Sequence, residues 1–343
     1  DGAGAGAAIT DVLDVLGGAG NIALGSGAMG IALTTGTDNV AVGENAGDAL
    51  TSGSDNTFVG DEAGGATTTG ANNIAIGSAA LDGNTTASDN IAIGINALGA
   101  SNTSANNVAI GSGAMDANTG GSGVAIGKDA FGANTTGGSN TAVGYVALTA
   151  NTTGSGNVAV GAGALDAATT ANNNTAVGAD SLSAATTGHS NTAVGKEAGE
   201  ALTTGVSTVF IGSGAGEAAT TGDYNVAVGS EALTALTTAS NNTAVGYAAL
   251  TAITTGDRSV AVGTNAADAI VSGGRNNAIG YNALGADTLG SRAVALGYGA
   301  LQTQNFTTAT DNYNVGLGYN AGGAITTGTL NTGVGGLALN TNT

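Results

Sequence analysis

Residues 140–156 read NTAVGYVALTANTTGSG, and this stretch is one copy of a repeat that fills most of the chain. A short aliphatic run ends on Gly144, and a glycine ends the same run in nineteen copies, nearly all 17 residues apart. The copy is too short for a packed pair of helices, and its apolar positions lack helical spacing. The N-T-A-V-G run alternates as a strand does, and T-T-G-x-x-N is rich in turn formers. The sequence therefore predicts an all-β chain, a parallel β-solenoid of about 19 coils with 17 residues per coil.

Each column of the aligned repeat predicts a structural role. The glycine needs a positive φ, or lies where the backbone is too crowded for a Cβ atom. The aliphatic residue before it is expected to stack from coil to coil as a core stripe. The asparagine that opens fifteen copies is expected to form an amide ladder along the axis. The alanine three residues after the glycine marks a position with little space. Members of these columns are Gly43, Gly77, Gly144 and Gly246; Val143 and Val245; Asn73, Asn140 and Asn242; and Ala147 and Ala249.

Two copies depart from the repeat in a correlated way. Phe58 and Phe210 stand where most copies have alanine, and glycine replaces the usual leucine in the same coil and in the coil before. A large residue thus appears where large residues vanish, which indicates volume compensation between columns that touch. The contact lies within one core or across a subunit boundary, so both phenylalanines are candidates for assembly contacts. The glycines concerned are Gly47, Gly64, Gly199 and Gly216.

The first twenty residues do not fit the repeat. Their apolar side chains fall on one side of a short helix if that segment is helical; they include Ile9, Val12, Leu13 and Leu16. The end of a solenoid exposes unpaired strand edges that must be covered or paired. We therefore expect residues 1–20 to cap the solenoid or to dock to a neighbour, and residues 21–343 to form the repeat domain.

Composition excludes several classes of function. The chain has 24 acidic and 5 basic residues, a net charge of −19, which argues against nucleic acid as a partner. No apolar run reaches the length of a membrane span. There is no cysteine and a single histidine, His189, in a turn, so a hydrolytic triad is not expected and the chain is predicted not to be an enzyme. No cofactor is expected; incidental Ca²⁺ binding by the scattered acidic pairs is the alternative.

The repeat resembles two families of surface fibres. NIAIG at 73–77, NVAIG at 107–111 and NVAVG at 157–161 are similar to the head repeats of trimeric autotransporter adhesins, whose repeats are typically shorter. The full unit, at 140–154 and 242–256, resembles the repeats of phage tail fibres more closely. The resemblance implies a left-handed parallel β-roll, side-by-side homotrimers and a place outside the cell, on a cell or virion surface.

Three hypotheses of function follow. The first is a fibre shaft or head that associates with itself, with a homotrimer favoured and a cell-surface receptor or glycan as an additional partner. The second is a filament stacked end to end through residues 1–20 and the last coil. The third is a ligand-binding solenoid, with paired threonines facing ice or an exposed tyrosine column stacking on a glycan. That column holds Tyr145, Tyr247 and Tyr281, for which we prefer an intersubunit seam.

Overall fold

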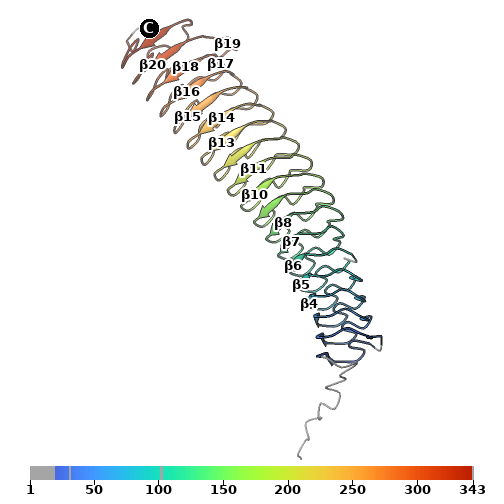
Figure 1. Cartoon of the computed structure of the whole chain (residues 1–343). Helices are drawn as coiled ribbons and strands as arrows, with labels where there is room; N and C mark the ends of the chain where they lie inside the picture. Colours follow the sequence, from blue (N-terminus) through green and yellow to red (C-terminus); the bar gives the residue numbers. More distant parts are fainter. Residues whose placement is uncertain (1–19, 31, 101–102, 342–343) are drawn as a thin grey trace, which may run out of the picture. The chain divides into compact units, whose positions relative to one another are not determined.

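The computed structural model describes residues 20–30, 32–100 and 103–341, and these residues form a parallel β-solenoid that contains no helix (Figure 1). The predicted all-β solenoid with coils of about 17 residues is thereby confirmed. The chain divides into two compact units, Asp1–Gly156 and Asn157–Thr343. The described part holds no helix long and apolar enough to cross a membrane. The expected cap residues Ile9, Val12, Leu13 and Leu16 lie outside the described residues.

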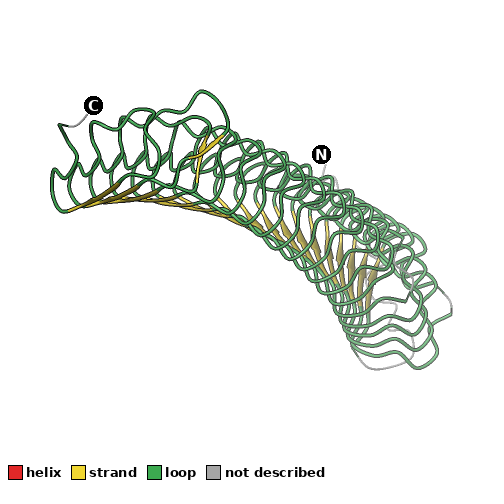
Figure 2. Cartoon of the chain, turned by 90° about the horizontal axis from the view of Figure 1, so that it is seen from above, coloured by secondary structure: helices red, strands yellow, loops and turns green. Residues whose placement is uncertain are grey.

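Each coil contributes one strand of three residues to a parallel sheet, in register with the strand of the next coil. In the first unit the strands are β1 (Ile22–Leu24), β2 (Val40–Val42), β3 (Thr57–Val59), β4 (Ile74–Ile76), β5 (Ile91–Ile93), β6 (Val108–Ile110), β7 (Val124–Ile126) and β8 (Thr141–Val143). In the second unit they are β9 (Val158–Val160), β10 (Thr175–Val177), β11 (Thr192–Val194), β12 (Val209–Ile211), β13 (Val226–Val228), β14 (Thr243–Val245), β15 (Val260–Val262), β16 (Asn277–Ile279), β18 (Val294–Leu296), β20 (Val315–Leu317) and β21 (Thr332–Val334). Figure 2 shows that within each unit these strands share one side of the coils, while turns form the rest.

The orientation of the strands corrects one expectation from the sequence. The middle residue of each strand is buried, whereas the residues on either side are half-buried or exposed. Ala142 and Ala244 are therefore core residues, while Val245 is 36% exposed and Val143 is half-buried. The prediction that the aliphatic column forms the core stripe is wrong. Alternation puts a strand's neighbouring residues on opposite faces, and the core side belongs to alanine.

Small residues and leucine fill the thin core. Ala147 and Ala249, predicted to have little space, are completely buried, and the leucine that follows each of them is buried as well. These leucines adopt a positive φ, +55° at Leu148 and +52° at Leu250, which points them inward from a tight turn. The coil is thus too narrow for two layers of β-branched side chains, and the strand must offer its smallest residue to the interior.

Buried asparagines link the coils along the axis. The Asn73 side-chain carbonyl accepts the Asn90 backbone N–H at 3.1 Å, and the Asn73 amide donates to Ala87 O at 2.9 Å. Asn242 repeats this pattern with Ser259 and Gly256 in the second unit, and Asn140 donates to Gly154. Each amide therefore satisfies backbone groups that the turns would otherwise bury without partners.

The repeat glycine satisfies both conditions that the sequence suggested. At Gly77 and Gly246 the φ angle is +134°, outside the range of residues with a side chain. A Cβ atom added to Gly77 would lie 2.6 Å from the carbonyl oxygen of Gly94 in the next coil. The corner therefore needs glycine both for its backbone conformation and for the close approach of the next coil.

A longer coil interrupts the second unit. The spacing from Gly297 to Gly318 is 21 residues, and this longer coil contains β19 (Thr310–Asp311). This strand pairs in parallel with β17 (Gly290–Ser291) of a preceding coil, forming a small second sheet. The insertion thus brings Asp311 beside the turn that leads into β18.

Candidate functional site

The outer face of the parallel sheet is the most extensive candidate surface. In every three-residue strand the first and third residues point away from the core, and most of them are valine or isoleucine. None of these strand residues is charged, and several are well exposed, among them Ile76 at 39% and Ile279 at 40%. Parallel sheets normally have both faces covered. An uncovered apolar face of this kind is typical of an interaction surface.

The size of this face is set by the stacking of strands. At a strand spacing of about 4.8 Å, the eleven principal strands of the second unit extend for roughly 50 Å. Two outward side chains per strand give a strip roughly 10 Å wide with an area of roughly 500 Å², most of it apolar. Patches above a few hundred Å² on a soluble protein are usually functional.

The tyrosine column is exposed, and its rings stack on each other. Tyr281, Tyr298 and Tyr319 lie on consecutive coils, with ring centroids 5.1 and 5.4 Å apart and planes inclined by 15° and 18°. Their faces therefore cover one another, which leaves mainly ring edges for a partner. Tyr145 and Tyr247 are also exposed but stand apart from this stack, and the ammonium of Lys128 lies 5.7 Å from the Tyr145 ring. This geometry favours a seam over stacking against a sugar ring.

Phe58 and Phe210 are not assembly contacts, which corrects a second expectation. Both side chains are completely buried. A Cβ atom on Gly199 or Gly216 would lie 2.7 Å from a ring carbon of Phe210, and Gly47 stands equally close to Phe58. The compensation between columns therefore takes place inside one core, and neither ring is available to a partner.

The paired threonines divide into two roles. The first hydroxyl of each pair donates to a carbonyl of the next coil, as Thr203 does to Thr220 at 3.0 Å and Thr237 to Thr254 at 3.1 Å. The second threonine is exposed, for example Thr187 and Thr204. Each coil thus offers one outward threonine from a turn, beside a backbone that is not a strand.

Acidic side chains form columns across neighbouring coils. Burial raises the pKa of Asp166, and the charge of Asp180 adds to the rise. Burial also raises the pKa of Glu200, with repulsion from Glu197 and Glu217 acting in the same direction. Within residues 20–30, 32–100 and 103–341, no three such side chains are grouped so that they could hold a metal ion. The single histidine, His189, is exposed and contacts the hydroxyl of Ser190 at 3.3 Å.

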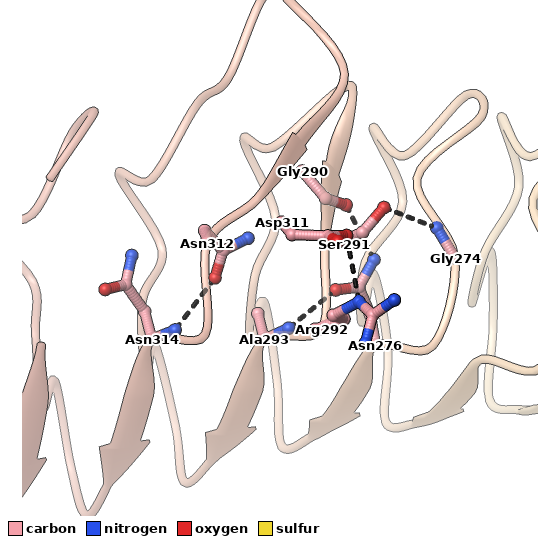
Figure 3. Close-up of polar contacts among 9 residues, drawn as sticks. All are labelled: Gly274, Asn276, Gly290, Ser291, Arg292, Ala293, Asp311, Asn312 and Asn314. Atoms are coloured by element: carbon pink, nitrogen blue, oxygen red, sulfur yellow. Dashed lines mark hydrogen bonds and ion pairs between the residues drawn. The ribbon is translucent and has the colours of Figure 1, made fainter. Parts of the chain in front are cut away.

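A column of arginines was missed in the sequence. Arg258, Arg275 and Arg292 occupy the same place in three consecutive coils, and a search for like residues 17 apart would have found them. Figure 3 shows the last of them: Arg292 pairs with Asp311 of the inserted strand, with 2.9 Å between Nε and Oδ1. In the same view Ser291 accepts the Gly274 N–H, and Asn276 accepts the Ala293 N–H.

A cavity in the last coil belongs to the core. It is lined by Ile325, Asn331 and Leu339, among others, and has a volume of about 380 Å³. These residues occupy the columns that the next coil covers elsewhere in the solenoid. The cavity is therefore the uncovered interior of a coil rather than a built ligand site.

Comparison with known proteins adds no family. The chain matches none of the protein-family models, and no curated protein matches it.

Proposed function

We propose that this chain is a structural fibre protein that associates laterally through the outer face of its parallel sheet. The single observation that carries the proposal is the outward face of the three-residue strands, which is uncharged, mostly valine and isoleucine, and half-buried to exposed. The chain carries a net charge of −19 but leaves this strip uncharged and open to water. Pairing with copies of itself would bury the apolar strip, which is favourable. The homotrimer is the favoured state, in keeping with the resemblance to surface fibres, and the cell or virion surface is the proposed location.

Self-association suits a repeat protein for a geometric reason. Every coil presents two uncharged outward residues at the same spacing, so two copies in register repeat a similar contact from strand to strand. Each contact is small, but the contributions add over the eleven principal strands of the second unit. The stacked tyrosines form a second exposed column near the end of the strands and would extend such a seam.

The test places charge on this face. Val177 and Val194 are outward residues of neighbouring strands, and Val194 is 37% exposed. We expect the variant Val177→Lys/Val194→Lys to shift the mass measured by sedimentation equilibrium from trimer towards monomer, because ammonium groups would be buried without partners. The matched control is Thr187→Lys/Thr204→Lys, which adds the same charge in the same two coils on exposed turn residues.

Two results would contradict the proposal. One is a monomeric wild-type protein at every concentration tested. The other is an equal loss of association in the face variant and in the turn control, since that would assign the effect to net charge. Filaments that form only end to end, and that survive both variants, would instead support the alternative of axial stacking.

A further inference from the structure

Three of the five basic residues of the chain are concentrated in one place. Arg258, Arg275 and Arg292 stand in the turn just before the buried residue that leads into β15, β16 and β18. Backbone hydrogen bonds connect these turns directly: Arg275 N donates to Asp257 O at 2.8 Å, and Arg292 N donates to Gly274 O at 3.1 Å. At a coil spacing of about 4.8 Å, the three cationic side chains emerge as neighbours.

The backbone at these positions disfavours arginine. The φ angles of Arg258, Arg275 and Arg292 are +59°, +59° and +66°. Most other coils have asparagine, aspartate or serine at this position, as at Asn173 and Ser190. Asparagine and aspartate tolerate the left-handed region, while long side chains are strained there by about 1–2 kcal/mol. Three successive strained arginines with mutual repulsion point to a role other than stability.

The inserted coil neutralises only one of the three. Arg292 is half-buried, forms the ion pair with Asp311, and lies 5.3 Å from the ring centroid of Tyr313. Arg258 and Arg275 are exposed, and no ion pair involves either of them in the described part of the chain. Two guanidinium groups therefore remain available side by side.

Hydroxyl groups surround these two arginines in a shallow pocket of about 210 Å³. Thr255, Ser272 and Ser291 line it, together with Gly256 and Gly274. Ser291 Oγ accepts the Gly274 N–H at 3.1 Å, so its own proton is free to be donated. Asp257 also lines the pocket; its carboxylate accepts the Ser240 N–H of the preceding coil at 2.7 Å, and its charge leaves the two arginines with a net charge of +1 at the site.

We infer that this pocket binds a single oxyanion, a sulfate or phosphate group, between the guanidinium groups of Arg258 and Arg275. Guanidinium groups donate in a planar fork that matches such oxygens, and serine and threonine hydroxyls supply the remaining donors. The net charge of −19 repels a long polyanion, so the site suits one small group held by short-range contacts. This inference does not depend on the proposed self-association.

The experiment is equilibrium dialysis of the full chain against radiolabelled sulfate, with ionic strength held constant by sodium chloride. We expect one saturable site per chain. The variant Arg258→Gln/Arg275→Gln should weaken binding by roughly tenfold or more, because two charge-assisted donors are lost. The matched control, Lys128→Gln/Lys196→Gln, removes the same charge from lysines that are paired with Asp129 and Glu197 and should change binding by less than about twofold.

Circular dichroism and sedimentation of each variant show whether fold and association are retained. Displacement of the labelled sulfate by dextran sulfate would assign the site to a group carried on a polymer, and failure to displace it would assign the site to the free anion. The inference is overturned if the wild type shows no saturable binding, or if the arginine and lysine variants lose affinity equally. It is also overturned if the arginine variant alters self-association and leaves sulfate binding unchanged.

Discussion

The contact between Phe210 and the glycines beside it allows a sharp test of how the core is packed. Phe210 is completely buried, and its ring occupies the space that a leucine fills in other coils. Phe210→Ala removes that ring and leaves a cavity, at an expected cost of about 3–5 kcal/mol. Gly216→Leu places a Cβ atom 2.7 Å from two carbons of this buried ring, at a cost of about 3 kcal/mol or more.

The two changes should compensate when they are combined. Phe210→Ala/Gly216→Leu restores the usual alanine and leucine of the repeat, and four added carbons return about 3 kcal/mol of burial. Leucine at φ +62° costs about 1–2 kcal/mol, a strain that Leu233 already tolerates at +56°. The double variant should therefore lie about 1–4 kcal/mol below the wild type, with a coupling energy of about 4 kcal/mol or more.

Native-state hydrogen exchange of the β12 amides is the suitable assay, because repeat proteins open locally and a global unfolding transition need not be two-state. Exchange in β4, in the other unit, serves as the internal control and should not change. Additive costs of the two single substitutions would refute the reasoning, since they would mean that ring and leucine do not share one space.

Three further predictions concern the rest of the coil. In the wild type the Asn174 side chain bonds to the Asn191 N–H and to Gly188 O, each at 2.9 Å, and Asn174→Ala leaves both groups buried without a partner. The free energy of local opening measured by hydrogen exchange should therefore fall by about 2–5 kcal/mol, and no change would refute the role of the ladder. Gly246→Ala forces a Cβ atom to 2.6 Å from Gly263 O and should cost about 3 kcal/mol or more, with loss of protection in β14; wild-type protection there would contradict it. Burial raises the pKa of Asp166 in the folded state, so the contribution of Asp166 to stability is most favourable below its unfolded pKa and is lost as pH rises through its folded pKa. The thermal midpoint should therefore increase as the pH is lowered from 7 to about 4, and it should increase less in Asp166→Asn. A midpoint that decreases over this range would contradict the sign.

The sequence indicated only in part which face of the strand points inward, and the prediction was wrong. The aliphatic column looked like a core because β-branched residues usually are buried. The exchange of alanine for Phe58, coupled to loss of the nearby leucine, indicated that the two columns touch, and the structure places this contact inside the core. Since strand neighbours alternate, Val59 and its equivalents had to face outward. In a narrow coil, paired changes of side-chain size between two columns thus indicate which residues point inward better than hydrophobicity alone does.

The candidate surfaces differ in how far sequence could define them. Tyr281 and its neighbours in the column were recognised as exposed from their spacing, but only the structure shows that their faces are stacked. The arginine pocket needed three-dimensional information for a different reason. Arg292 is separated from its partner Asp311 by the inserted residues, so the sequence does not reveal which arginine is neutralised.

The sequence by itself determined the coil: its 17-residue period, the glycine corner at Gly77 and the asparagine ladder through Asn73. These features are local or repeat at a fixed spacing, so stacking identical units reproduces them. Only the tertiary structure decided which face of the strand is inside, that Phe210 belongs to the core, and that Arg258 and Arg275 remain unpaired beside each other. Those outcomes depend on the width of the coil and on contacts between coils, which residue types and their order do not specify.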